Sequence, residues 1–168
     1  PEAITECIKN ENNVQLMAKE FISAKGSMFL GRGSSFPIAL EGALKLKELS
    51  YLHAEGYPAG EMKHGPLALI EEGLPVIIIA PKNKYFEKTI SNMQEVIARG
   101  GKILFITDRK KESLNENIRF GFRVPHLDIL LSPILLTIPL QMLAYHVALL
   151  KNCDVDKPRN LAKSVTVE

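Results

Sequence analysis

The 168-residue sequence has no tryptophan, only two cysteines and no block of like charge. Its 21 Lys and Arg residues nearly balance 19 Asp and Glu residues, and the basic residues are scattered along the chain. A nucleic-acid-binding surface concentrates its positive charge, so we expect no nucleic-acid partner. Cys7 and Cys153 form no metal-binding or redox spacing. We therefore expect no metal and no cofactor, and the sparse cysteines favour a reducing, cytoplasmic compartment.

Long hydrophobic runs are scarce as well, with one exception at residues 129–150. That run is interrupted by Pro133, Pro139, Gln141 and His146. The interruptions favour a buried core helix over a membrane span, so no membrane partner is expected. No signal peptide is recognisable, and a chain that starts at Pro1 is expected to be part of a longer protein.

What the sequence does contain is an alternation of apolar strands with amphipathic helices. Strands are predicted at residues 28–31, 76–80, 102–107 and 118–124. Helices are predicted at 3–23, with a break near Asn12 and Asn13, and at 37–50, 84–99 and 130–151. Residues 53–64 are predicted to form a loop. The strands are apolar throughout, which indicates an α/β fold with a mostly parallel sheet covered by helices on both faces.

A glycine turn, GRGSS at residues 31–35, follows the first predicted strand. Ligands of such sheets bind beyond the carboxyl ends of the strands, so the turn is a candidate site. It is neither a GxGxxG nor a Walker A motif, because Phe36 stands where a third glycine would be. Ser34 and Ser35 have two interpretations, contact with a phosphate or capping of the following helix.

Three charged residues share one face of the predicted helix 37–50, namely Glu41, Lys45 and Glu48. They form either an ordinary exposed ion pair or a site in which Glu48 acts as a general acid or base. His64 lies in a predicted loop, where its ring is either solvated or able to reach a ligand. Near the terminus, Lys163 stands beside apolar residues, and such a lysine can lose its proton and attack a carbonyl.

Two motifs together identify a resemblance. GALKLKELSYLHAEGYPAGEMKHGPLALI, followed later by DVDKPRNLAKSVTVE, resembles the carboxyl-terminal half of the isomerase part of the glucosamine-6-phosphate synthases. The resemblance implies a flavodoxin-like SIS domain, with a mostly parallel five-stranded sheet in a three-layer α/β/α sandwich. We expect a helical arm at residues 1–24, the SIS domain at 25–152 and an active-site tail at 153–168. The family also implies a cytoplasmic homodimer.

The family's residue roles fall on the positions already singled out. The resemblance implies that Lys163 forms a Schiff base with open-chain fructose 6-phosphate and that Glu48 moves the proton between C1 and C2. It implies that His64 assists ring opening from the neighbouring subunit. Lys45 would support Glu48, and Ala162 would line the sugar site. The product of the family's reaction is glucosamine 6-phosphate, made with ammonia from glutamine.

The sequence also departs from the complete family pattern. It contains neither the glutaminase domain nor the first SIS half, whose SxSGxT-type loop holds the sugar phosphate. The corresponding residues here, 81–84, read Pro-Lys-Asn-Lys. We therefore expect this segment to be inactive or weakly active by itself. Two alternatives remain: a non-catalytic SIS module that senses a sugar phosphate, and a glutamine-independent SIS deaminase or isomerase.

Overall fold

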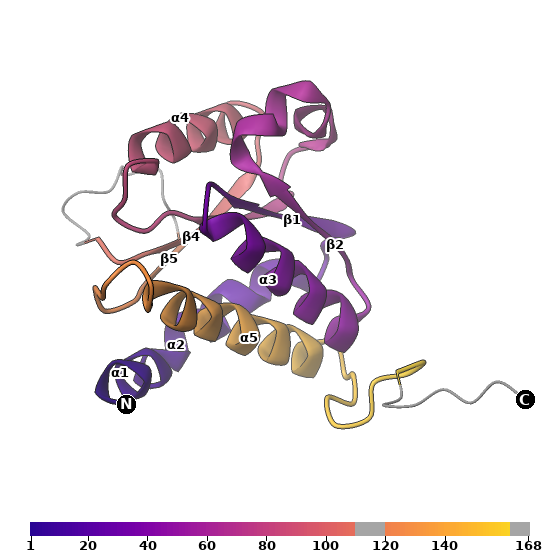
Figure 1. The fold of residues 1–168 in the computed structure, drawn as a ribbon. Helices are drawn as coiled ribbons and strands as arrows, with labels where there is room; N and C mark the ends of the chain where they lie inside the picture. The colour runs from indigo at the N-terminus through magenta and orange to yellow at the C-terminus, as the bar shows by residue number, and fades with distance from the viewer. Residues whose placement is uncertain (110–119, 162–168) are drawn as a thin grey trace, which may run out of the picture.

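A parallel five-stranded sheet forms the centre of the protein in a computed structural model that describes residues 1–109 and 120–161 (Figure 1). The strands are β1 (Gly26–Gly31), β2 (His53–Pro58), β3 (Pro75–Ile79), β4 (Lys102–Thr107) and β5 (Phe120–Arg123). Their order in the sheet is β2-β1-β3-β4-β5, and each neighbouring pair is parallel. The predicted α/β fold with a parallel sheet is confirmed.

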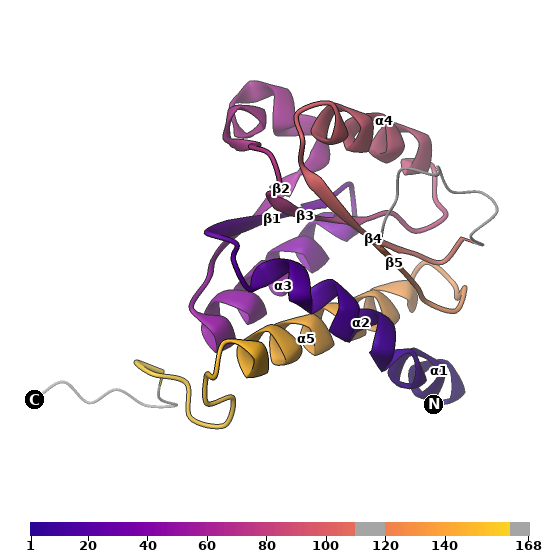
Figure 2. The ribbon, with the colours of Figure 1, turned by 180° about the vertical axis from the view of Figure 1, so that it is seen from behind.

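Helices cover both faces of this sheet (Figures 1 and 2). The α-helices are α1 (Glu2–Lys9), α2 (Glu11–Ala18), α3 (Ser35–Ser50), α4 (Phe86–Ile97) and α5 (Ser132–Leu150). Three short 3₁₀ segments are η1 (Lys19–Phe21), η2 (Ala59–His64) and η3 (Pro66–Leu69). Helices α2, α3 and α5 lie on one side of the sheet, whereas α4 and the η2–η3 segment lie on the other. The result is a three-layer sandwich.

The sheet separates two hydrophobic cores, and alternate residues of β3 enter different ones. Ile77 and Ile79 join the core under α3 and α5, and Val76 and Ile78 join the core under α4. All four side chains are at most 1% exposed. Successive strand residues point to opposite faces, so a strand covered on both sides needs apolar residues at every position. The unbroken apolar run of β3 therefore reflects its central place.

Helix α5 lies within the apolar run 129–150, for which the sequence favours a buried core helix over a membrane span. Among the described residues it is the one helix long and apolar enough to cross a membrane, and half of its most apolar window is buried inside the protein. It packs along α3, where the Cδ1 atom of Leu140 lies 2.9 Å from the place a Cβ would occupy on Gly42. A larger residue than glycine would push the two helices apart. The packing is that of a core helix.

Two local predictions were wrong. Residues 53–58, predicted as part of a loop, form the edge strand β2, which pairs with β1 from Gly26–His53 to Gly31–Pro58. The amino-terminal helix breaks at Asn10, between α1 and α2, and not near Asn12. Residues 1–24 also pack into the domain, because Cys7, Val14 and Met17 belong to the core under α5.

Candidate functional site

Helix α3 carries the charged residues singled out in the sequence. It begins at the carboxyl end of β1 and runs back along the sheet to the edge where β1 and β2 begin. Its last residue is Ser50, whose Oγ donates a hydrogen bond to the Leu46 carbonyl oxygen at 2.6 Å. Tyr51 follows in a left-handed conformation (φ 58°), and its N–H bonds the Lys47 carbonyl oxygen. This left-handed residue ends the helix.

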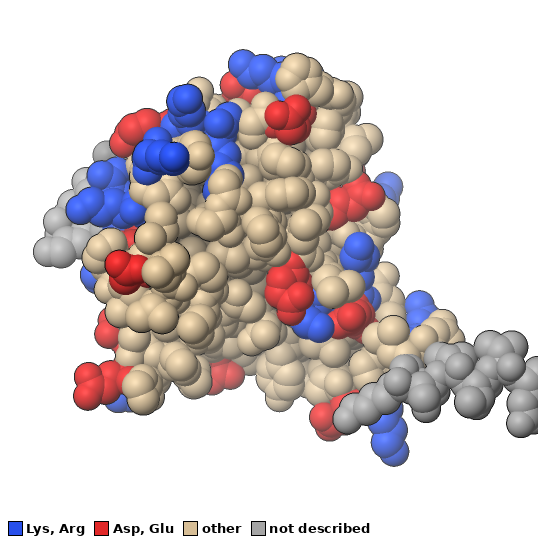
Figure 3. All heavy atoms as spheres, in the orientation of Figure 1, with Lys and Arg blue, Asp and Glu red and all other residues tan. Residues whose placement is uncertain are grey.

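The carboxylate of Glu48 lies at this end of α3 and is held by Lys45. The Lys45 Nζ donates to Glu48 Oε2 at 2.8 Å and lies 3.8 Å from Glu41 Oε1. Hydrogen bonding to Glu48 raises the pKa of Lys45 above its usual value, so the ammonium stays protonated. Figure 3 shows acidic and basic side chains side by side over α3, with uncharged atoms around them. With 28% of its side chain exposed, Glu48 is half-buried yet accessible to a ligand.

The carboxyl-terminal tail lies beside the same end of α3. After α5, the Asp154 Oδ1 accepts hydrogen bonds from the backbone N–H groups of Asp156 and Lys157, which turns the chain. The Arg159 N–H then donates to the Tyr51 hydroxyl oxygen at 2.9 Å. The tail is thus fixed one helical turn beyond Glu48.

The predicted site residues Ala162 and Lys163 lie outside the described residues.

His64 and Glu48 lie at opposite ends of the parallel strands. It ends η2, which follows the carboxyl end of β2, and neighbouring Gly60 contacts Arg32 just before α3. The stretch of α3 from its first residue to Glu48 is about 20 Å long at 1.5 Å per residue. The His64 side chain is 74% exposed, with its Nε2 3.9 Å from Glu61 Oε2. One chain therefore brings Glu48 and the tail together but does not bring His64 to them.

The two serines of the glycine turn differ in exposure. Ser34 is the exposed N-cap residue of α3, but its side chain makes no capping hydrogen bond. Ser35 is 1% exposed, and its Oγ has no hydrogen-bond partner within residues 1–109 and 120–161. Side-chain capping is therefore absent at this helix start, whereas a role in phosphate binding stays a prediction.

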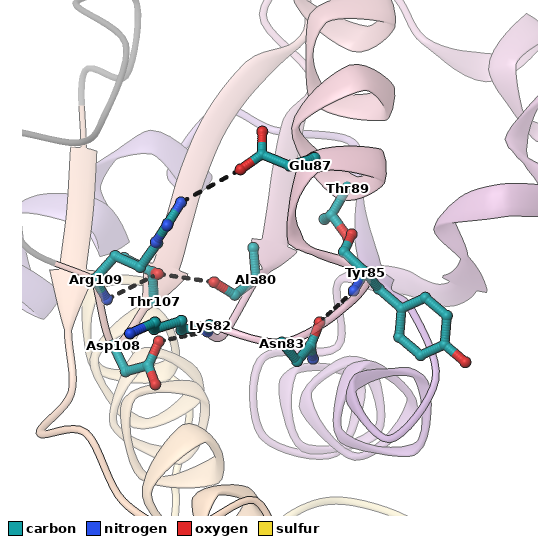
Figure 4. Close-up of polar contacts among 9 residues, drawn as sticks. All are labelled: Ala80, Lys82, Asn83, Tyr85, Glu87, Thr89, Thr107, Asp108 and Arg109. Atoms are coloured by element: carbon teal, nitrogen blue, oxygen red, sulfur yellow. Dashed lines mark hydrogen bonds and ion pairs between the residues drawn. The ribbon is translucent and has the colours of Figure 1, made fainter.

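The loop after β3 is occupied by its own hydrogen bonds (Figure 4). The Lys82 N–H donates to Asp108 Oδ1 at 2.6 Å, and the Tyr85 N–H donates to Asn83 Oδ1 at 2.8 Å. Thr107 donates from its Oγ1 to the Ala80 carbonyl oxygen at 2.7 Å. The backbone amides of Lys82 and Tyr85 are thus bonded to side chains and not free to bind an anion.

Asp108 is the buried centre of this network, and its other oxygen lies 2.6 Å from the Nδ1 of His126. Replacing Asp108 with Ala leaves the Lys82 amide without its hydrogen-bond acceptor, so we expect the free energy of unfolding to fall by about 1–3 kcal/mol. Thermal unfolding of the full-length protein measures it, with Asp156→Ala as the exposed control. A variant as stable as that control would contradict the predicted role of Asp108.

No group of three or more His, Cys, Asp or Glu side chains in the described part of the chain is placed to hold a metal ion. Two of the contacts described above were not predicted from the sequence. Tyr51 and Arg159 are 108 positions apart, and Asp108 and His126 are 18 apart. Neither spacing matches a local pattern, although Asp108 directly after a buried strand was a usable signal.

The parallel sheet with helices on both faces is the architecture predicted for an SIS domain. Residues 20–151 match the family model of the SIS domain, and the chain belongs to that family.

Within the family, the chain is similar to glutamine–fructose-6-phosphate aminotransferases [isomerizing]. The chain is 53% identical over its whole length to the glutamine–fructose-6-phosphate aminotransferase [isomerizing] of Bartonella henselae, and covers 28% of that protein. It is 56% identical over 92% of its length to the aminotransferase of Agrobacterium fabrum, and covers 26% of it. The chain thus spans little more than a quarter of these relatives.

Solved structures agree with this placement. The C-terminal domain of glucosamine-fructose-6-phosphate aminotransferase from Francisella tularensis is 43% identical, with a TM-score of 0.89 over 93% of this chain and 44% of that one. Glucosamine-6-phosphate deaminase from Thermotoga maritima is 25% identical, with a TM-score of 0.66 over 96% of this chain and 49% of that one. The predicted resemblance to the carboxyl-terminal SIS half is confirmed.

Proposed function

We propose that this chain supplies the sugar-isomerising side chains of a glutamine–fructose-6-phosphate aminotransferase. The observation that carries the proposal is the placement of Glu48 and the carboxyl-terminal tail at one end of α3. The similarity to aminotransferases over the whole chain supports the assignment of the substrate. The complete reaction would draw on the first SIS half and the glutaminase domain, in the cytoplasm.

The proposed chemistry begins at the amine of Lys163. Its neutral form attacks the C2 carbonyl of open-chain fructose 6-phosphate, and loss of water leaves an imine. Ammonia released from glutamine then displaces the lysine amine and leaves a free imine at C2. This imine acidifies the C1–H bond, so a carboxylate can remove that proton and return it to C2. Glu48 is suited to this task because it is accessible and because the protonated Lys45 fixes one of its oxygens. Ala162 would line the same site.

The distant position of His64 makes a second subunit part of the proposal. His64 lies beyond the carboxyl ends of the strands, whereas Glu48 lies about 20 Å from that end along α3. His64 therefore cannot act on a sugar bound at Glu48 of its own chain. In a homodimer, the exposed η2 segment of one subunit would bring His64 to the Glu48 of the other, where its imidazole would assist ring opening.

Trapping the imine tests the function directly. The full-length protein, incubated with fructose 6-phosphate and sodium borohydride, is expected to gain one reduced sugar adduct on the peptide that contains Lys163. Mass spectrometry of the digested protein locates the adduct. Lys163→Arg should remove it, because a guanidinium does not form the imine under these conditions. A wild-type protein without adduct, or an adduct that persists in Lys163→Arg, would reject the proposal.

A further inference from the structure

Tyr51 makes two contacts with one residue of the tail. Its hydroxyl oxygen accepts the N–H of Arg159 at 2.9 Å, and its ring centroid lies 4.1 Å from the Arg159 guanidinium carbon. The hydrogen bond fixes the backbone of the tail, and the cation–π contact fixes the side chain. Two different interactions therefore hold the same point.

The backbone of Tyr51 explains why its ring is available to the tail. Its φ of 58° is left-handed, a conformation that glycine usually supplies at a helix end. A side chain in this conformation carries a cost, which a structure tolerates where the side chain is needed. Asn160 in the tail is also left-handed, with φ 61°. The chain therefore turns sharply at Tyr51 and at the residue directly after Arg159.

The other side-chain hydrogen bonds of the described tail residues lie at its start or inside the tail itself. Cys153 Sγ lies 4.0 Å from the Ser50 carbonyl oxygen, at the beginning of the tail. The hydrogen bonds of Asp154 remain inside the tail itself. Within residues 154–161, Arg159 is joined to the domain by its hydrogen bond and its cation–π contact with Tyr51.

Tyr51 joins the helix that carries Glu48 to the tail that leads to Lys163. Glu48 precedes it by about one turn of α3, and Lys163 follows Arg159 by four residues. We propose that Tyr51 is a positioning residue, which holds the carboxyl-terminal tail at the end of α3 through Arg159 and thereby supports the reaction of Lys163 and Glu48. The proposal rests on the function proposed above, and it assigns Tyr51 no contact with the sugar.

The experiment compares Tyr51→Ala and Tyr51→Phe in the full-length protein. Tyr51→Ala removes both contacts, whereas Tyr51→Phe removes the hydrogen bond and keeps the ring. Hydrogen exchange at the Arg159 amide is expected to accelerate about tenfold in either variant, because the hydroxyl acceptor is lost. The kcat of sugar isomerisation should fall about tenfold or more in Tyr51→Ala and less in Tyr51→Phe, with glutamine hydrolysis unchanged.

A matched control is Tyr145→Ala, which removes an exposed tyrosine from α5. It should leave both the exchange rate and kcat as in the wild type. Unchanged exchange at Arg159 in the Tyr51 variants would overturn the contact, and unchanged kcat with faster exchange would overturn its positioning role. Failure of the proposed function is recognised separately, by the absence of the borohydride adduct in the wild-type protein.

Discussion

Glu48→Gln in the full-length protein is expected to lower the kcat of sugar isomerisation by at least a hundredfold. A positioned general base contributes about 10²–10⁴ to the rate, and an amide cannot accept the C1 proton. The substitution keeps the size of the side chain and removes only its charge. The hydrogen bond from Lys45 can still be made to the amide oxygen, so the fold of α3 should persist.

The control for this experiment is Glu41→Gln, on the same face of α3. Glu41 lies 3.8 Å from Lys45 and carries the same charge, so both variants change the electrostatics of the helix in similar ways. We expect Glu41→Gln to isomerise within a fewfold of the wild-type rate, since exposed ion pairs contribute little. Glutamine hydrolysis should continue in both. Isomerisation by Glu48→Gln at the wild-type rate would exclude Glu48 from the chemistry.

The central strands could be predicted from the sequence because both of their faces are buried. Every residue of β3 and four of the six residues of β4 are apolar, with Lys102 and Thr107 at the two ends of β4. The edge strand β2 gave no such signal, since its sequence HAEGYP mixes polar, charged and glycine residues. Its strand conformation comes from pairing with β1, which is a tertiary effect.

In the candidate site, contacts between residues of one helix could be predicted from their spacing in the sequence. The pairing of Lys45 with Glu48 follows from their separation of three residues. Tyr51 with Arg159 could not be found in this way, because the order of the strands and the path of the tail decide which distant segments meet. Glu48 and His64 are likewise only 16 positions apart in the sequence. In the fold they lie at opposite ends of the strands, because β2 runs from one end to the other between them.

That separation changes what the set of Glu48, His64 and Lys163 can do within a single chain. In a parallel sheet, the helix between two strands runs back to the end of the sheet where the next strand begins. The end of that helix and the loop after the next strand therefore lie at opposite ends of the strands. No movement of side chains closes about 20 Å. If the imidazole acts on the sugar held at Glu48, the active unit must contain two chains. Mixing Glu48→Gln subunits with His64→Ala subunits should then restore activity, because one site of the mixed dimer combines an intact Glu48 with an intact His64.

Gly31→Ala is expected to cause the largest loss of stability of any small substitution considered for this chain. An ideal Cβ on Gly31 would lie 2.2 Å from the Ser35 carbonyl oxygen and 2.8 Å from the Phe36 backbone nitrogen. Both atoms belong to the first turn of α3, so a change of rotamer cannot relieve the clash. The helix would have to move off β1, at a cost of about 3 kcal/mol or more. Thermal unfolding of the full-length protein measures the effect.

Gly26→Ala, at the beginning of the same strand, is the matched control. There the added Cβ would lie 3.3 Å from the His53 carbonyl oxygen, a contact that a shift of a few tenths of an ångström relieves. We expect a cost of less than about 1 kcal/mol, within the range of mild core substitutions. Gly31→Ala and Gly26→Ala proteins of equal stability would show that α3 does not depend on close approach to β1. The same result would remove the physical reason for glycine at the turn that starts the helix carrying Glu48.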